Sequence, residues 1–139
     1  MQEVPFTATS YQEFLKQRKL MGTRCVTDGQ LFLPPRALCP DHFSGAMEWV
    51  RLSGRGRLAA FSIIYIGTDG MIEAGYHRKN PYCAAIIALE EGPQISAQLL
   101  DVDPHHPETI RIGMPVQADY IERENSEGAQ TFLAFRPAG

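Results

Sequence analysis

Two short cysteine-containing turns constrain this sequence more than any other feature. The first runs from Cys25 to Asp28 and the second from Cys39 to His42, each with two residues between its ends. Paired zinc ligands are commonly separated in the same way, because a tight turn presents both side chains to one point. Two thiols, a carboxylate and an imidazole therefore form a candidate tetrahedral metal site on a small two-turn finger.

Two interpretations of these turns stay open. In the first, zinc binds through Cys25, Asp28, Cys39 and His42. In the second, the finger keeps its shape without metal, because each ligand must be deprotonated and well positioned, and only two of the four are thiols. A disulfide between Cys25 and Cys39 is disfavoured in a reducing compartment.

The chain has the composition of an ordinary folded protein. It has 139 residues, of which 44% are hydrophobic and 21% charged, and its net charge is −3. This length fits one compact domain with a small appendage, or two very small units. The apolar runs are too short to span a bilayer, no secretory signal is recognisable, and three cysteines make no disulfide framework. We therefore expect a cytoplasmic protein that crosses no membrane.

Residues 10–20 are predicted to form a helix. Ser10 is the candidate cap, and Glu13 three residues later completes a capping box. Tyr11, Phe14 and Leu15 form an apolar stripe at helical spacing. Because so short a helix is unstable alone, the stripe must pack on something, either the rest of the chain or a partner.

From Met47 onward the pattern predicts strands. Trp49–Leu52 and Leu58–Ile66 flank the glycine-containing run Ser53–Arg57, which we interpret as a bend or bulge inside one long curved strand. Thr68–Asn80 is predicted to be a loop. Four further segments are predicted as strands because turn residues separate them: Tyr82–Glu90, Gln94–Leu100, Val116–Glu124 and Thr131–Phe135.

Five strands with a long, bent first strand are what a small OB-fold barrel requires. The predicted fold class is therefore mainly β, with an N-terminal helix, a zinc-ribbon-like finger and a five-stranded OB-fold barrel. We expect the helix to occupy residues 1–22, the finger residues 23–46 and the barrel residues 47–139.

The order and spacing of several motifs resemble the bacterial and archaeal family once filed as domain of unknown function thirty-five (DUF35). The matching segments are Leu20–Cys25, Leu33–Arg36 leading to Cys39 and Pro40, Glu48–Val50 before Ser53–Gly56, Pro81–Tyr82, Ile112–Val116 and Phe135–Pro137. Together they extend from about residue 10 to the end of the chain, which makes the resemblance fairly specific.

The resemblance implies a rubredoxin-like zinc ribbon joined to an OB-fold, in a non-catalytic accessory subunit. Such a subunit would dock on a thiolase-like condensing enzyme, or on a related hydratase or aldolase, and would bind or channel an acyl-CoA. Family members typically carry cysteine at the positions of Asp28 and His42. This chain departs from the family at the metal site.

Basic residues give the CoA hypothesis a chemical basis. A CoA ester carries a diphosphate and a 3′-phosphate, which arginine and lysine bind through charge-assisted hydrogen bonds. The candidate residues are Arg36, Arg55, Arg57, Arg78 and Lys79. Arg51 lies in the same sequence cluster as Arg55 and Arg57. The alternative is that these are solvated strand-edge charges that discourage edge pairing.

No catalytic residue is predicted. Cys83 lies in an apolar run, where a buried thiol is inert. His105 and His106 form an adjacent pair in a predicted surface loop. Asp101 and Asp103 are explained by the turn at a strand end.

Three other hypotheses about function and assembly stay open. OB-folds bind single-stranded nucleic acid through basic grooves and stacking aromatics, although the net charge of −3 weighs against this. A pure scaffold would hold its partners without binding a ligand. A homodimer is expected for the isolated chain if the apolar stripe of the helix stays uncovered.

Overall fold

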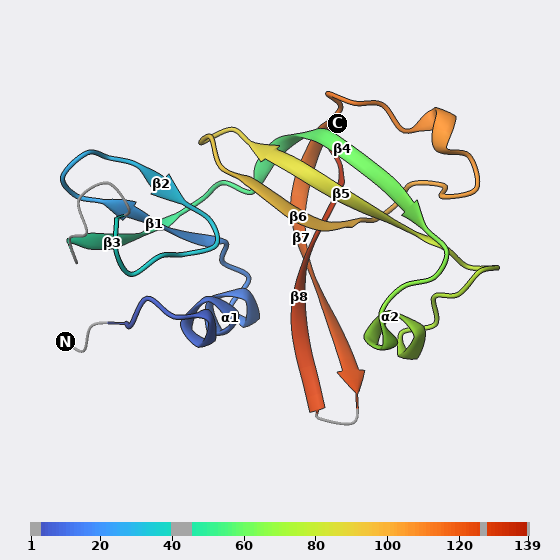
Figure 1. Ribbon diagram of the computed structural model, residues 1–139, viewed down its shortest axis with the longest axis horizontal. Helices are drawn as coiled ribbons and strands as arrows, with labels where there is room; N and C mark the ends of the chain where they lie inside the picture. Colours follow the sequence, from blue (N-terminus) through green and yellow to red (C-terminus); the bar gives the residue numbers. More distant parts are fainter. Residues whose placement is uncertain (1–3, 40–45, 126–127, 139) are drawn as a thin grey trace.

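The computed structural model describes residues 4–39, 46–125 and 128–138, in which a three-stranded finger lies beside a closed five-stranded barrel (Figure 1). In chain order the elements are α1 (Ala8–Lys16), β1 (Met21–Cys25), β2 (Leu31–Phe32), β3 (Met47–Arg51), β4 (Arg55–Ile64), α2 (Asp69–Glu73), β5 (Tyr82–Leu89), β6 (Gln94–Leu99), the 3₁₀ helix η1 (Pro107–Thr109), β7 (Pro115–Asn125) and β8 (Gly128–Pro137). The mainly β fold class, with a helix, a finger and an OB-type barrel, is confirmed.

Helix α1 begins earlier than predicted, because Thr7 caps it instead of Ser10. The Thr7 side-chain oxygen accepts the backbone N–H of Ser10 at 3.2 Å. Glu13 forms an ion pair with Lys16 at 3.2 Å, one turn further along the helix. The predicted capping box is therefore wrong, and the helix ends at Lys16 rather than at residue 20.

The apolar face of α1 is covered by its own chain. Leu15 is 2% exposed, and Tyr11 packs against the same hydrophobic cluster, where burial raises its pKa to about 12. The ring of Phe14 meets Trp49 edge-on, with centroids 5.0 Å apart. Of the two alternatives for this stripe, packing within the chain is the one observed. The homodimer stays a prediction, without the support of an uncovered helix.

Strand β3 belongs to the finger. It pairs antiparallel with β1 from Met21 opposite Arg51 to Cys25 opposite Met47, which gives the sheet order β2-β1-β3. The predicted single strand through residues 49–66 is therefore wrong, because Gly54 (φ 78°) turns the chain between two different sheets. The predicted domain limits of 1–22, 23–46 and 47–139 stay predictions, although the finger sheet continues to Arg51.

The barrel closes in the order β4-β5-β6-β8-β7. Strand β7 returns to β4 through the pairs from Arg55–Gln117 to Arg57–Pro115. Strands β6 and β8 run parallel and pair at Gln98–Ala134 and Leu99–Phe135. Beyond this short contact β7 and β8 continue as a long hairpin that passes between α1 and α2 in the view of Figure 1.

A bulge in β4 decides which of its side chains face the core. Leu58 pairs with Ile87 and Ala60 pairs with Ile86, so Ala59 is an extra residue in the strand. The alternation of side chains resets at this point. Phe61 consequently packs against the core, while Ala60 faces outward. Of the bend or bulge predicted at Ser53–Arg57, the bend is observed at Gly54, whereas the bulge lies further along β4, at Ala59.

The predicted loop 68–80 contains the short helix α2. The guanidinium of Arg123, on β7, lies 5.8 Å from the ring centroid of Tyr76 and 5.3 Å from that of Phe132. It also donates a hydrogen bond to the thioether sulfur of Met71, in α2, at 3.5 Å. These contacts attach α2 to the β7–β8 hairpin.

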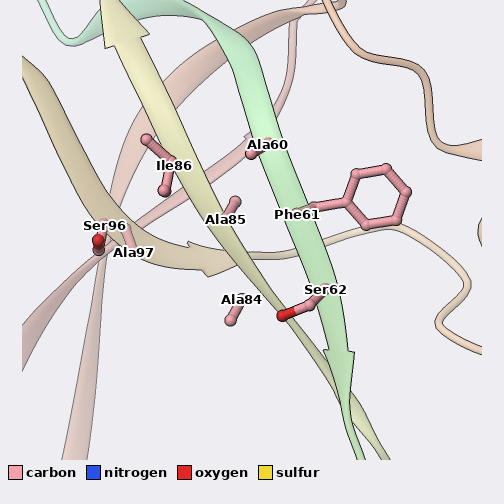
Figure 2. A pocket seen from close by; sticks show the side chains of 8 residues that line it. All are labelled: Ala60, Phe61, Ser62, Ala84, Ala85, Ile86, Ser96 and Ala97. Atoms are coloured by element: carbon pink, nitrogen blue, oxygen red, sulfur yellow. The ribbon is translucent and has the colours of Figure 1, made fainter.

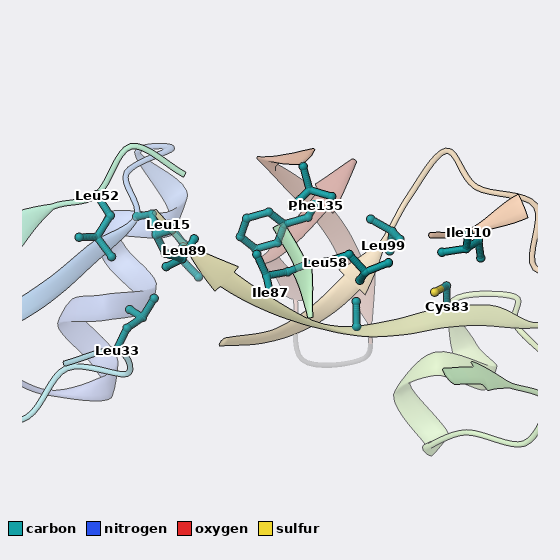
Figure 3. Close-up of a cluster of buried hydrophobic side chains, with 13 residues drawn as sticks. Leu15, Leu33, Leu52, Leu58, Cys83, Ile87, Leu89, Leu99, Ile110 and Phe135 are labelled. Carbon is teal, nitrogen blue, oxygen red and sulfur yellow. The ribbon is translucent and has the colours of Figure 1, made fainter. Parts of the chain in front are cut away.

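One hydrophobic core extends from the finger into the barrel (Figure 3). Leu15 and Leu52, from α1 and the finger–barrel junction, belong to the same cluster as Leu58, Ile87 and Phe135 of the barrel. Leu52 is only 4% exposed. Moving the finger away from the barrel would expose these side chains to water, so the core fixes the orientation of the two parts.

Replacing Gly54 by alanine tests the turn between the finger and the barrel. An added Cβ would lie 2.8 Å from the Cβ of Ala118, and the positive φ of 78° is itself unfavourable for a side chain. We expect the free energy of unfolding, measured by urea denaturation, to fall by about 1–3 kcal/mol.

Gly75→Ala is the matched control for this substitution. Gly75 also has a positive φ of 99°, but no atom lies within 4 Å of the added Cβ. It should therefore destabilise the protein less than Gly54→Ala. Equal losses for the two variants would contradict a specific role for the close approach to Ala118.

Candidate functional site

The two cysteine turns of the finger bring three metal-ligating residues together. Cys25 ends β1, Asp28 lies in the turn that follows, and Cys39 belongs to the second turn. Their ligand atoms all lie within 4.8 Å of one another. The Gly29 N–H closes the first turn by donating to the Cys25 carbonyl at 2.8 Å, and Gly29 adopts a positive φ of 79°.

Gln30 orients the carboxylate of Asp28. The backbone N–H of Gln30 donates to Oδ1 at 2.9 Å, and its side-chain amide donates to Oδ2 at 2.7 Å. The Cys39 thiol lies 3.7 Å from the same Oδ2 atom. Outer hydrogen bonds of this kind hold a ligand in the orientation that a metal requires.

The donor set fits zinc. Cys25 and Cys39 are fully buried at 0% exposure, whereas Asp28 is exposed. Thiolate and carboxylate are both established zinc ligands. His42 lies outside the described residues, so its role as a ligand stays a prediction. Among the residues that the structure describes, no disulfide joins Cys25 to Cys39.

A polar groove of about 560 Å³ lies where α1, the finger and the barrel meet. We call it the arginine groove, and its charged and amide side chains are Arg18, Arg51, Arg55, Glu90, Glu91 and Gln117. Arg18 follows α1, Arg51 ends β3 and Arg55 begins β4. The three arginines are brought together because the shared core holds the finger against the barrel.

The charges in the arginine groove are unevenly compensated. Arg55 pairs with Glu90 at 3.0 Å, and this hydrogen bond raises the pKa of Arg55 and lowers that of Glu90. Glu91 accepts the backbone N–H of Ser53 at 2.7 Å. Within the described part of the chain, the side chain of Arg51 has no ion pair or hydrogen bond. It is therefore available to an external anion.

A second groove, of about 430 Å³, continues from the arginine groove along the barrel. It shares Arg55, Glu90 and Gln117 with the arginine groove and adds Arg57 and Ala88. Arg57 donates to the carbonyl of Gly113 at 3.0 Å and stays exposed. Arg55 and Arg57 thus lie two residues apart on the outer face of β4.

The other predicted CoA-binding residues lie elsewhere. The Arg36 guanidinium lies 5.5 Å from the ring centroid of Phe32, in the finger. Arg78 and Lys79 are exposed in the turn between His77 and Asn80, which follows the far end of β4 from Arg55. The structure therefore brings Arg55 and Arg57 together and separates them from the rest of the predicted set.

Most of the residues that the sequence analysis judged non-catalytic are buried or paired with neighbouring charges. Burial raises the pKa of the Cys83 thiol to about 11, which disfavours the reactive thiolate. His106 lies 3.1 Å from Glu108 and 3.9 Å from Asp103, in an exposed loop. Asp101 pairs with Arg136.

A shallow groove of about 440 Å³ lies on the outer face of β4, β5 and β6, and most of the outward side chains that line it are small (Figure 2). The outward residues are Ala60 and Ser62 on β4, Ala84 and Ile86 on β5, and Ser96 on β6. The Phe61 ring points away from the other labelled side chains (Figure 2) and packs against the core.

Two family profiles match this chain. The ChsH2 rubredoxin-like zinc ribbon domain matches residues 13–48, and the ChsH2 C-terminal OB-fold domain matches residues 49–120. The chain is a member of the ChsH2 (DUF35) family. The resemblance that the sequence motifs indicated is therefore confirmed, and a zinc-binding finger agrees with the Cys25, Asp28 and Cys39 cluster.

Relatives of this chain include a scaffold protein, a thiolase subunit and a solved aldolase. A DUF35 domain-containing scaffold protein of Methanothermobacter thermautotrophicus is 30% identical over 135 residues, which cover 94% of this chain and 96% of that protein. Benzoylsuccinyl-CoA thiolase subunit BbsA of Thauera aromatica is 41% identical over 80 residues, or 58% of this chain and 51% of that subunit. The solved Ltp2-ChsH2(DUF35) aldolase matches with a TM-score of 0.77 and 27% identity, covering 100% of both chains.

These relatives support an accessory or scaffold role for this ChsH2-family chain. One of them is named a scaffold protein and another a thiolase subunit. The described part of the chain contains no helix of the length and apolar character needed to cross a membrane.

Sequence reasoning missed Arg18 and Gln117 as members of the arginine groove. Arg18 is held by a hydrogen bond of 3.3 Å to the Tyr120 carbonyl, a residue far away in the sequence. Neither residue belongs to a local motif. Only the proximity of Arg51 to Arg55 in the sequence gave a signal for this groove, because the two flank a short turn.

Gln30→Ala tests the metal site through the group that orients Asp28. We expect the zinc affinity, measured by competition with a chromophoric chelator, to fall about 10–100-fold, as for other outer-shell partners. Gln130→Ala, at an exposed position of β8, is the control and should leave the affinity unchanged. Unchanged affinity in Gln30→Ala would contradict coordination through Asp28.

Proposed function

We propose that this chain is a non-catalytic accessory subunit that docks on a thiolase-like condensing enzyme and contributes a binding site for the phosphates of its CoA ester. The observation that carries the proposal is the arginine groove. It gathers three arginines from separate elements, and the guanidinium of one of them, Arg51, has no ion pair or hydrogen bond within the described residues.

The chemistry of the groove suits a phosphate ligand. Arginine presents a planar set of N–H donors that matches two oxygens of one phosphate. Arg51 and Arg55 flank the turn at Ser53 and Gly54, and both line the same groove. Glu90 already neutralises part of the charge of Arg55. An incoming phosphate would therefore be bound mainly by Arg51, with Arg55 shared between the phosphate and Glu90.

The exposure of the groove favours a site completed by a partner. The side chains of Arg18 and Arg55 are 61% and 65% exposed, so water screens their interaction with a free ligand. An enzyme docked over the groove would exclude water and strengthen the same contacts. This reasoning agrees with an accessory subunit better than with an independent CoA-binding protein.

Single-stranded nucleic-acid binding receives less support. OB-folds bind single strands across the outer faces of their second and third strands, which are β5 and β6 here. On these two strands the groove is lined by Ala84, Ala85, Ile86, Ser96 and Ala97, none of which is aromatic or charged. Tyr82, at the start of β5, does not line the groove, and its ring packs against Tyr76 with centroids 5.3 Å apart. Saturable binding of a labelled oligonucleotide with a steep salt dependence would revive this alternative.

The double variant Arg51→Ala/Arg55→Ala tests the CoA role in the complex with the partner enzyme, which a pull-down from the native host would identify. Each charge-assisted hydrogen bond contributes about 1.5–3 kcal/mol. Losing them should raise the KM for the acyl-CoA about tenfold or more, with complex formation preserved.

Arg78→Ala/Lys79→Ala is the matched control. It removes the same number of positive charges from the loop after the far end of β4 and should leave the KM unchanged. A pure scaffold would show an unchanged KM in both variants. Equal increases in both would mean that net charge, rather than the arginine groove, determines the binding of the CoA ester.

A further inference from the structure

We infer that the outer face of β4, β5 and β6 forms a track for the pantetheine and acyl chain of a ligand whose phosphates bind in the arginine groove. This inference rests on the proposed function and specifies which part of the ligand lies where. The ligand class is an extended chain, mostly methylene and amide groups, attached to a phosphate-bearing end.

The register of the strands makes the track continuous. On the outer face Arg57 lies opposite Ala88, the next outward pair is Ala60 and Ile86, and the one after it is Ser62 and Ala84. The first of these pairs lines the groove of about 430 Å³ that contains Arg55. The next two line the groove of about 440 Å³ in Figure 2.

The track has the dimensions of a chain-like ligand. From Glu90 to Ala84 along β5, at about 3.3 Å per residue, it extends for roughly 20 Å. The groove that forms its second part has a volume of about 440 Å³, in the usual range of small-molecule sites, roughly 300–1,000 Å³. Small outward side chains keep the groove open over its length.

The bulge at Ala59 creates this surface. Without the extra residue, strict alternation after Leu58 would turn Phe61 outward and Ala60 inward. The large ring would then fill the groove. With the bulge, Phe61 packs against the core and the outer face keeps only Ala60 and Ser62. The same bulge therefore places the Phe61 ring against the barrel core and leaves the groove on the outer face open.

The polarity of the track changes from one end to the other. Arginines surround its first part, whereas Ala60, Ala84 and Ile86 dominate the second, and Ile86 is 41% exposed. Ser62 and Ser96 add hydroxyl groups that suit the amides of a pantetheine arm. A ligand with phosphate at one end and an apolar chain at the other matches this gradient.

Ala60→Phe tests the track, because the added ring would fill the groove at an exposed strand position that favours aromatic residues. We would titrate the complex of the full chain and its partner enzyme with hexanoyl-CoA and with 3′,5′-ADP, which lacks the chain. The enzyme's own site is the same in every complex, so differences between variants report on this chain.

We expect Ala60→Phe to weaken hexanoyl-CoA binding about tenfold, as steric exclusion of one ligand segment would, and to leave 3′,5′-ADP binding unchanged. Ala129→Phe, at an exposed position of β8, is the control for an added surface ring. Ile86→Ser, which removes apolar surface without blocking the groove, should also weaken only the hexanoyl-CoA.

The outcomes separate this inference from the proposed function. If Arg51→Ala/Arg55→Ala weakens 3′,5′-ADP while Ala60→Phe and Ile86→Ser leave hexanoyl-CoA unaffected, the track is wrong and the phosphate site stands. If the arginine variant alters neither ligand, the proposed function fails and the inference fails with it. Thermal unfolding of each variant shows whether a loss of binding reflects a loss of fold.

Discussion

The burial of Leu52 between the finger and the barrel is the constraint on which the rest of the structure depends. This residue follows β3 and lies in one core with Leu15 of α1 and Leu58 of β4. Because the three come from different parts of the molecule, separating the finger from the barrel would expose all of them. Because the finger is held in one orientation against the barrel, Arg51 at the end of β3 lines the same groove as Arg55, and this forms the arginine groove.

The sequence predicted the elements of the fold better than the connections between them. Turn residues between the apolar segments located the barrel strands to within a few residues, because the signal for each turn is local in the sequence. The segment 49–66 was misassigned because its pattern suits one long strand or two, and only the pairing of β3 with β1 decides between them. Likewise, Thr7 and Ser10 are both acceptable helix caps, and local sequence does not separate them.

The two candidate sites differ in how far the sequence determines them. Cys25 and Asp28 lie in one turn, so their spacing alone predicted a shared metal site. The cations are different, since five basic residues spread along the chain were all chemically suitable for phosphate. Their grouping depends on the register of β4 and on the docking of the finger, so of that set only Arg55 and Arg57 line the same groove.

An acidic protein with a site for an anion is not a contradiction. The net charge of −3 acts over the whole surface, and salt screens it beyond about 10 Å. A phosphate responds to the groups within a few ångströms, where Arg51 has no counter-ion among the described residues. The acidic side chains near it, Glu90 and Glu91, are already engaged by Arg55 and by the backbone of Ser53. Net charge therefore sets how the protein behaves toward long polyanions, whereas the arrangement of three arginines sets what a small phosphate ligand encounters.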